Sequence, residues 1–503
     1  MATDASAESA PDAYDALLDH YRRYASLRST QQLLSWDQQV MMPEGGTPAR
    51  SRQQSAMSGL THDLITDDAV ADWLDELEAA DLDAERAAVV REIRRRHERS
   101  SAVPRALVET ISEKTTEALS VWEDARENAD FDAFAPTLSE LIQLRREYAE
   151  HIDPDREPYA VLFEDYEPYL PLSTADRVLG RLREELVPLV DAVADSGATI
   201  DSPFAGGTYA PDAQEALARE VLDVVGYDWD RGRLDTSTHP FTAGNQFDCR
   251  ITTRYDEDDP VDGLMSTIHE FGHANYNLGL PQDDFGTPLG ESRDLTVHES
   301  QSRFWENHVG RSAPFWDRIA PLVREHLGLD AEADAMYRAA NQVYDDNPIR
   351  VEADELTYHL HIVLRYEIER DLVRGDLDVE EVPAVWNDKM DDYLGLRPED
   401  DAEGCLQDIH WSHANFGYFP TYSLGSVLAA QLDHHLRADV GDVDALVRAG
   451  DLDPVHDWLA EHVHRHGARY TTPELIREAT GEDYTADYFV DYVTAKYGEL
   501  YGL

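Results

Sequence analysis

The chain has 503 residues, 42% of them hydrophobic, which is enough to build a large buried core and excludes disorder throughout. It carries 102 acidic against 43 basic residues, and the resulting net charge of −59 repels nucleic-acid phosphates and anionic lipid surfaces. Neither nucleic acid nor a membrane is therefore an expected partner.

The first twelve residues are rich in Ala, Ser, Asp and Pro and lack both a basic region and an apolar stretch. We therefore predict a flexible segment at 1–12 that is not a signal peptide. No Pro-, Gly- or Ser-rich linker divides residues 13–503, which favours one large domain. Cys249 and Cys405 form no paired motif, so neither a disulfide framework nor a cysteine metal site is indicated, and a reducing cytoplasm fits.

Helical periodicity extends over most of the sequence, so the predicted fold class is mainly α. Near the start, Tyr14, Leu17, Tyr21 and Tyr24 fall three or four residues apart, on one face of a helix. Further amphipathic helices are predicted over residues 84–98, 104–128, 173–195, 354–373 and 421–436.

The segment 233–255 is the exception to this helical pattern. Residues that favour strands lie on either side of Gly244 and Asn245, which predicts a short β-hairpin. A helix then begins near Val261 and is closed by Gly279 and Pro281.

The chemistry concentrates in that helix, which contains the pattern H-E-x-x-H as His269, Glu270 and His273. On a helix, imidazoles four residues apart share one face and reach a single ion. Glu270 points beside them, where a carboxylate takes a proton from water while zinc polarises a carbonyl. A glycine at position 272 lowers the stability of a helix by up to about 1 kcal/mol relative to alanine. This cost is understandable if another group must approach the helix closely at that position. The pattern indicates amide hydrolysis; the alternative is a core helix with buried histidines.

A catalytic zinc needs a third protein ligand and an open position. The next helical segment, residues 295–306, offers Glu299, His298 and Glu306. His298 faces about a third of a turn away from Glu299, and Glu306 lies about two turns further along the same face. Spacing alone leaves all three residues as candidates.

Short motifs occur in order along nearly the whole chain. They are LSWDQQVMMP at 34–43, HPF at 239–241, DCRIT at 248–252, HEFGH at 269–273, HESQ at 298–301, IRVEAD at 349–354, GCLQDIHW at 404–411 and GYFPTY at 417–422. With these motifs the sequence resembles the carboxypeptidase Taq type of metallocarboxypeptidases.

The resemblance implies a single, mostly helical, neurolysin-like domain with a deep central cleft and a small β-sheet near the active site, usually in a homodimer. It selects Glu299 as the third metal ligand, with Zn²⁺ as the metal and Co²⁺ as a substitute. The activity implied is stepwise removal of C-terminal amino acids from peptides, with broad side-chain tolerance and poor cleavage at proline.

A carboxypeptidase must recognise a free C-terminal carboxylate, for which a fixed cation with directed donors is best suited. Arg350, in the motif at 349–354, is the candidate. Asp248 is a candidate acceptor for a ligand imidazole. Further candidates, which donate to the carboxylate or the oxyanion or shape the site, are His410, Gln407, Tyr418, Tyr422, His239 and Arg250.

Two other functions remain open from the sequence. A zinc oligopeptidase or dipeptidyl carboxypeptidase on the same scaffold would use identical metal chemistry. A non-catalytic peptide-binding protein with a structural metal would have no use for the Glu270 carboxylate aimed at an open position.

The distribution of charge adds one expectation about the solvent. Acidic residues recur along the whole chain, and lysine is present only at Lys114, Lys389 and Lys496. This composition is similar to that of proteins from halophiles that accumulate salt. Molar salt shortens the Debye length to about 3 Å and screens the repulsion between carboxylates. We therefore expect the protein to require high salt.

Overall fold

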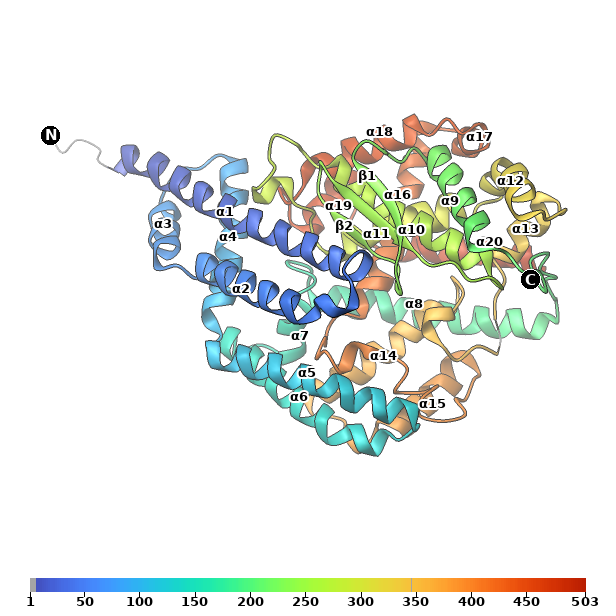
Figure 1. The fold of residues 1–503 in the computed structure, drawn as a ribbon, viewed down its shortest axis with the longest axis horizontal. Coiled ribbons are helices and arrows are strands. Elements are labelled where there is room, and N and C mark those ends of the chain that lie inside the picture. The colour runs from blue at the N-terminus through green and yellow to red at the C-terminus, as the bar shows by residue number, and fades with distance from the viewer. Residues whose placement is uncertain (1–5, 345) are drawn as a thin grey trace.

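The computed structural model describes residues 6–344 and 346–503, and over them the chain is mainly helical with one small sheet (Figure 1). This confirms the predicted fold class. The flexible segment predicted at 1–12 falls partly on residues 1–5, which lie outside the described residues, and helix α1 begins at Ser6.

The helices of the N-terminal part are α1 (Ser6–Val40), α2 (Thr47–Ile65), α3 (Asp68–Glu78), α4 (Ala84–Ala102), α5 (Arg105–Glu127), α6 (Phe131–Ile152), α7 (Pro158–Phe163), α8 (Leu172–Ser196) and α9 (Pro211–Val225). The remaining helices are α10 (Pro260–Gly279), α11 (Leu295–Arg303), α12 (Ala313–Leu327), α13 (Ala333–Ala340), α14 (Tyr358–Arg374), α15 (Val382–Leu394), α16 (Pro420–Val440), α17 (Val443–Ala449), α18 (Asp453–His462), α19 (Thr472–Thr480) and α20 (Asp487–Tyr501). A π-helical turn, η3 (Phe304–Gly310), follows α11 directly.

The predicted helices at 84–98, 104–128, 173–195 and 421–436 are confirmed as α4, α5, α8 and α16. Helix α14 begins at Tyr358 and not at the predicted residue 354. The reason is local, because the Asp354 carboxylate accepts hydrogen bonds from the backbone N–H groups of Leu356 and Thr357 and holds a turn there.

The sheet contains β1 (Gly232–Thr236), β2 (Thr242–Gly244) and β3 (Cys249–Thr253) in the order β1-β3-β2. Strands β2 and β3 are antiparallel and form the predicted hairpin. Strand β1 is parallel to β3 and was not predicted, because only Leu234 in it is buried and its sequence shows no alternation. Strand β2 lies at the edge of the sheet.

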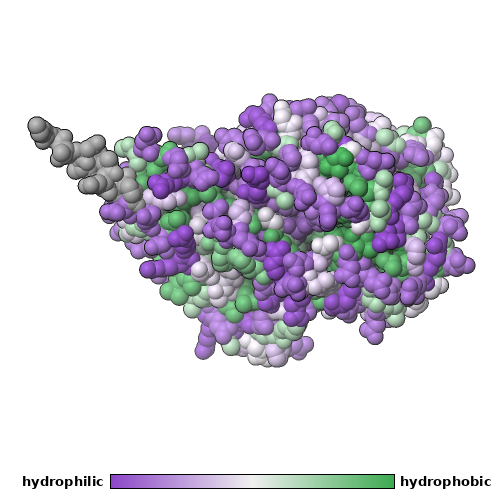
Figure 2. Space-filling view, turned by 90° about the horizontal axis from the view of Figure 1, so that it is seen from above, coloured by the Kyte–Doolittle hydropathy of each residue, from purple (hydrophilic) through white to green (hydrophobic). Residues whose placement is uncertain are grey.

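Two hydrophobic clusters hold the helices together. The larger cluster runs from α5 to α20 and includes Phe271 and Trp305, and a smaller one joins α1, α3 and α4 through residues such as Tyr21 and Leu74. Helices α1 and α2 lie side by side, as do α5 and α6 (Figure 1). Hydrophilic residues cover most of the face seen in Figure 2. None of the described helices combines the length and apolar character that a membrane crossing requires.

Two capped helices position the functional site. Helix α10 is capped by Asp259, whose carboxylate accepts hydrogen bonds from the N–H groups of Val261 and Asp262, with Pro260 at the first helical position. Helix α11 is capped by Asp294, whose carboxylate accepts a hydrogen bond from the N–H of Val297 at 3.1 Å. The starts of both helices are therefore fixed by side-chain caps.

Candidate metal centre and active site

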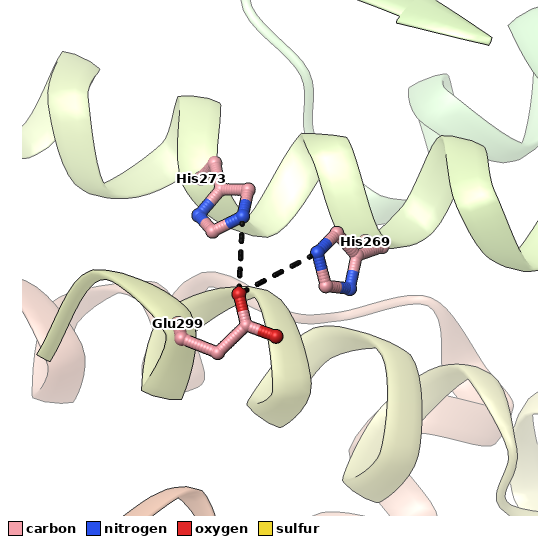
Figure 3. Close-up of side chains that lie close together, drawn as sticks. All are labelled: His269, His273 and Glu299. Atoms are coloured by element: carbon pink, nitrogen blue, oxygen red, sulfur yellow. Dashed lines mark ion pairs between the residues drawn. The ribbon is translucent and has the colours of Figure 1, made fainter. Parts of the chain in front are cut away.

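Helices α10 and α11 bring His269, His273 and Glu299 together (Figure 3). Both imidazoles project from α10 towards the Glu299 carboxylate on α11. The Oε2 atom of Glu299 lies 3.7 Å from Nε2 of His269 and 3.5 Å from Nε2 of His273. One ligand atom from each residue lies within 4.8 Å of the others.

These separations fit a shared metal ion better than direct hydrogen bonds. A hydrogen bond between nitrogen and oxygen is usually about 2.9 Å long. Two ligands that each lie about 2.1 Å from one ion at a tetrahedral angle are about 3.4 Å apart. Two imidazole nitrogens and one carboxylate oxygen are also a donor set that divalent transition metals accept.

The hydrogen bonds on the far side of each imidazole orient both rings for this purpose. Nδ1 of His269 lies 2.9 Å from Oε2 of Glu306, and Nδ1 of His273 lies 3.1 Å from the backbone oxygen of His298. Both partner atoms are acceptors, so both Nδ1 atoms carry a proton, and the Nε2 atoms, which face Glu299, are the ones that can bind a metal. Burial, with His298 and His269 nearby, holds the pKa of His273 well below its usual value.

The other two candidates for the third ligand have different roles. His298 stacks on His273 with ring centroids 4.4 Å apart, and its Nε2 lies 3.2 Å from Oδ1 of Asn277. Glu306 lies in the π-helical turn η3 and contacts the Nδ1 side of His269, away from the Nε2 atoms. Within residues 6–344 and 346–503, Glu299 is thus the carboxylate that the fold brings to both Nε2 atoms.

Two glycines allow this close approach of helices. A Cβ at Gly272 would lie 2.5 Å from the backbone oxygen of Gln301 and the Cα of Ser302, so α11 packs directly against α10 there. The prediction that something approaches Gly272 closely is confirmed. A Cβ at Gly425 in α16 would lie 2.5 Å from the side chain of Glu299.

Glu270 is a buried carboxylate held by the edge strand. The Thr242 hydroxyl lies 2.6 Å from Oε2 of Glu270 and 2.9 Å from its backbone oxygen. Burial raises the pKa of Glu270 to about 7, although His269 and Thr242 act in the opposite direction. Strand β2 therefore fixes the Glu270 carboxylate.

A second cluster of charged residues surrounds Arg350. Its Nε donates to Oδ1 of Asp408 at 2.9 Å and its Nη1 to the Tyr358 hydroxyl at 3.0 Å. Arg365 donates to the other Asp408 oxygen at 2.6 Å. Burial lowers the pKa of His410 to about 4, so this histidine is neutral. Two guanidinium groups and one carboxylate leave the buried cluster with a net positive charge.

Three of the predicted substrate-binding residues line this cluster. The His410 ring lies 5.5 Å from Tyr418, and Tyr418 lies 5.3 Å from Tyr422, between ring centroids. The guanidinium carbon of Arg350 lies 5.5 Å from the Tyr422 ring. The structure thus brings together Arg350, His410, Tyr418 and Tyr422.

Gln407 differs from its predicted role. Its Oε1 accepts a hydrogen bond from the backbone N–H of Arg350 at 2.8 Å, and its Nε2 donates to the backbone oxygens of Pro348 and Glu403. Its amide group is therefore occupied by backbone atoms, and Gln407 fixes the segment that carries Arg350.

The prediction for Asp248 is also corrected. Asp248 pairs with Arg250 at 2.8 and 2.6 Å and not with an imidazole; Glu306 takes the acceptor role at His269. Arg250 in turn stacks on Trp36 of α1, 4.2 Å from its ring centre. His239 is exposed in the connection between β1 and β2. Arg250, held by Asp248, therefore ties the hairpin to α1.

With this geometry the chain falls in the class of metallopeptidases, which place paired histidines and a carboxylate base on one helix. The family follows from comparison with known proteins. The model of the carboxypeptidase Taq (M32) metallopeptidases matches residues 16–497, so the chain belongs to that family. It is a metallocarboxypeptidase.

The chain is similar to relatives over nearly its whole length. It is 40% identical to thermostable carboxypeptidase 1 of Thermus thermophilus, over 97% of this chain and 99% of the relative. The crystal structure of the M32 carboxypeptidase from Deinococcus radiodurans superposes with a TM-score of 0.94 at 37% identity, covering 98% of this chain and all of that one. Metallocarboxypeptidase 1 of Trypanosoma cruzi gives 0.93 at 39% identity, covering 97% and 99%.

Proposed function

We propose that this metallocarboxypeptidase holds zinc on His269, His273 and Glu299 and releases amino acids one at a time from the C-terminus of peptides, with Glu270 as general base. The observation that carries the proposal is the position of Glu299 Oε2, 3.5 and 3.7 Å from the two Nε2 atoms. Two imidazole nitrogens and one carboxylate favour zinc, and Co²⁺ suits the same donors.

The zinc ion, when bound, acts as a Lewis acid that polarises the scissile carbonyl and lowers the pKa of water. Glu270 accepts the proton of the attacking water and delivers it to the leaving amine. Thr242 fixes the Glu270 carboxylate through the 2.6 Å contact with Oε2, which holds the carboxylate in place for proton transfer.

The Arg350 cluster supports recognition of a free C-terminal carboxylate. Asp408 and Tyr358 do not use all the N–H donors of the Arg350 guanidinium, and the cluster carries a net positive charge. The phenol groups of Tyr418 and Tyr422 and the imidazole of His410 supply further donors for the carboxylate and for the oxyanion.

The edge strand β2 can bind the part of the peptide that precedes its C-terminal carboxylate. Backbone hydrogen bonds join Phe241 to Thr252 and Asn245 to Asp248, so in this antiparallel pair Thr242 and Gly244 direct their N–H and C=O groups away from β3. An extended peptide adds to such an edge through its own backbone. Proline lacks the N–H that this pairing uses, so we expect poor cleavage at proline.

The test is a set of peptides of increasing length given to metal-depleted protein with and without Zn²⁺, in molar KCl, with products read by mass spectrometry. We expect single residues to leave the C-terminus only when zinc is present. A C-terminal amide should greatly reduce release, whereas internal cleavage or release of dipeptides would favour an oligopeptidase. Glu270→Gln should bind zinc without turnover, and a variant that still hydrolyses peptides would exclude Glu270 as the base.

A further inference from the structure

We infer that Arg303 is a positioning residue of the metal centre, which fixes Glu299 so that only one of its oxygens serves as a ligand. The inference rests on the proposed metal site and goes beyond it, because it assigns the residue that sets how Glu299 binds. Arg303 is the last residue of α11, one turn beyond Glu299.

Arg303 contacts two carboxylates at once. Its Nε donates to Oε1 of Glu299 at 2.8 Å, and its Nη1 lies 3.0 Å from Oε2 of Glu306. That Glu306 oxygen is the one that lies 2.9 Å from Nδ1 of His269. A continuous path of charged hydrogen bonds therefore joins Glu299 on α11 to His269 on α10.

The two oxygens of Glu299 have different surroundings. Oε1 pairs with Arg303, whereas Oε2 faces the two imidazoles. Ser302 also lies 3.3 Å from Oε2, but its hydroxyl is closer to the backbone oxygen of Glu299, at 2.8 Å. Charge-assisted hydrogen bonds are about twice as strong as neutral ones, so the ion pair keeps Oε1 away from the metal.

Neighbouring side chains fix the Arg303 guanidinium in this position. Its Cζ lies 5.1 Å from the centre of the Tyr358 ring, a cation–π contact. The Tyr358 hydroxyl accepts the hydrogen bond from Arg350. Tyr358 therefore contacts both Arg303, beside the metal ligands, and Arg350, the candidate for binding the substrate carboxylate. An arginine is required here because a planar fork reaches two carboxylates, which a single ammonium group cannot do in the same geometry.

Arg311 provides a matched control for charge and burial. It donates to Oε1 of Glu306 at 3.2 and 3.1 Å and to the backbone oxygen of Ala340. It shares Glu306 with Arg303 but has no contact with Glu299. Removing Arg311 therefore tests the loss of a buried charge without freeing Oε1 of Glu299.

The experiment compares Arg303→Lys, Arg303→Gln and Arg311→Gln by metal affinity and by the visible absorption of the Co²⁺-loaded protein, which weakens as the number of ligands rises. Partners of metal ligands typically contribute about 10- to 100-fold to metal affinity. We expect both Arg303 variants to lose affinity in this range and to show weaker cobalt absorption, because Oε1 becomes a ligand. Arg311→Gln should keep the wild-type spectrum.

Circular dichroism of the metal-free proteins shows whether each variant is folded, and Arg303→Lys retains the charge if Arg303→Gln does not fold. Wild-type affinity and spectrum in a folded Arg303→Lys protein would overturn the inference, as would the same spectral change in Arg311→Gln. Failure of the proposed function looks different: the wild-type protein itself would bind no metal or release no C-terminal residues.

Discussion

Gly425 on α16 faces Glu299 on α11 with no room for a side chain between them, since a Cβ at residue 425 would lie 2.5 Å from both Cβ and Cγ of Glu299. Gly425→Ala must therefore displace the candidate metal ligand. We expect metal affinity to fall by about 10- to 100-fold, the range seen when the support of a ligand is lost. Isothermal titration of metal-free protein with Zn²⁺ measures the loss.

Gly59→Ala in α2 is the control for Gly425→Ala, because nothing lies within 4 Å of a Cβ added there. It should leave metal affinity unchanged and stabilise the exposed helix by up to about 1 kcal/mol. Equal metal affinity in the two variants would mean that Glu299 does not depend on Gly425.

Replacing Thr242 by valine removes the hydroxyl that lies 2.6 Å from Oε2 of Glu270. A hydrogen bond to a charged group contributes about 1.5 to 3 kcal/mol, so kcat should fall by about 10- to 100-fold. Metal affinity and KM should change little, because Thr242 contacts neither the metal ligands nor the Arg350 cluster. Thr236→Val, at an exposed position of β1, is the control, and equal kcat in both variants would contradict this role.

Replacing Arg350 by glutamine removes a charged donor from the cluster that contains Asp408 and Arg365. Peptides with a free C-terminus should lose about 10- to 100-fold in kcat/KM, mainly through KM. Peptides with a C-terminal amide, which we expect to be poor substrates of the wild-type protein, should lose nothing further. Arg397→Gln, which removes an exposed arginine, is the control. A uniform loss on both kinds of peptide would instead indicate a structural defect.

Glu369 predicts a pH-dependent contribution to stability. It is fully buried and accepts hydrogen bonds from Nε1 of Trp411 at 2.9 Å and the N–H of Gly417 at 3.2 Å. Burial raises the pKa of Glu369 from 4.5 to about 8. The folded chain thus keeps a proton that the unfolded chain loses, so this contribution is full below pH 4.5 and is lost as pH rises to about 8.

Glu369→Gln should flatten the fall in stability across this window, measured as urea midpoints at intervals of pH. Glu380→Gln removes the same formal charge from an exposed position and should leave the wild-type slope. A slope for Glu369→Gln that equals that of the wild-type protein would contradict the assignment.

The net charge of −59 predicts that salt stabilises the fold. Screening shortens the range of repulsion between surface carboxylates to about 3 Å in molar salt. The melting temperature should therefore rise steeply between low and molar KCl. An equal concentration of an uncharged osmolyte should produce a smaller rise, and a melting temperature that does not respond to KCl would exclude a halophilic adaptation.

Much of the helical fold could be predicted because its signals are local. Helix α10 has an acidic cap, a proline at its first position and a glycine at its end, and all three are readable in the sequence. Strand β1 has no such pattern, because its place beside β3 is set by pairing with residues seventeen positions away. Long-range pairing of this kind leaves little mark on the strand itself.

The candidate site, like the fold, could be predicted only where its signals are local. The spacing of His269 and His273 indicates a shared ion, whereas the choice among Glu299, His298 and Glu306 was left open by spacing. The turn at η3 is π-helical, so the α-helical spacing that placed Glu306 on the face of Glu299 does not hold there. The pairing of Arg365 with Asp408, 43 residues apart, was missed because it depends on tertiary structure alone.

The most direct test of the metal site is a crystal structure of the zinc-loaded protein with anomalous diffraction measured on both sides of the zinc absorption edge. We predict one strong anomalous peak within bonding distance of Nε2 of His269, Nε2 of His273 and Oε2 of Glu299. A peak at any other position, or zinc-loaded active protein with no peak between α10 and α11, would contradict the account.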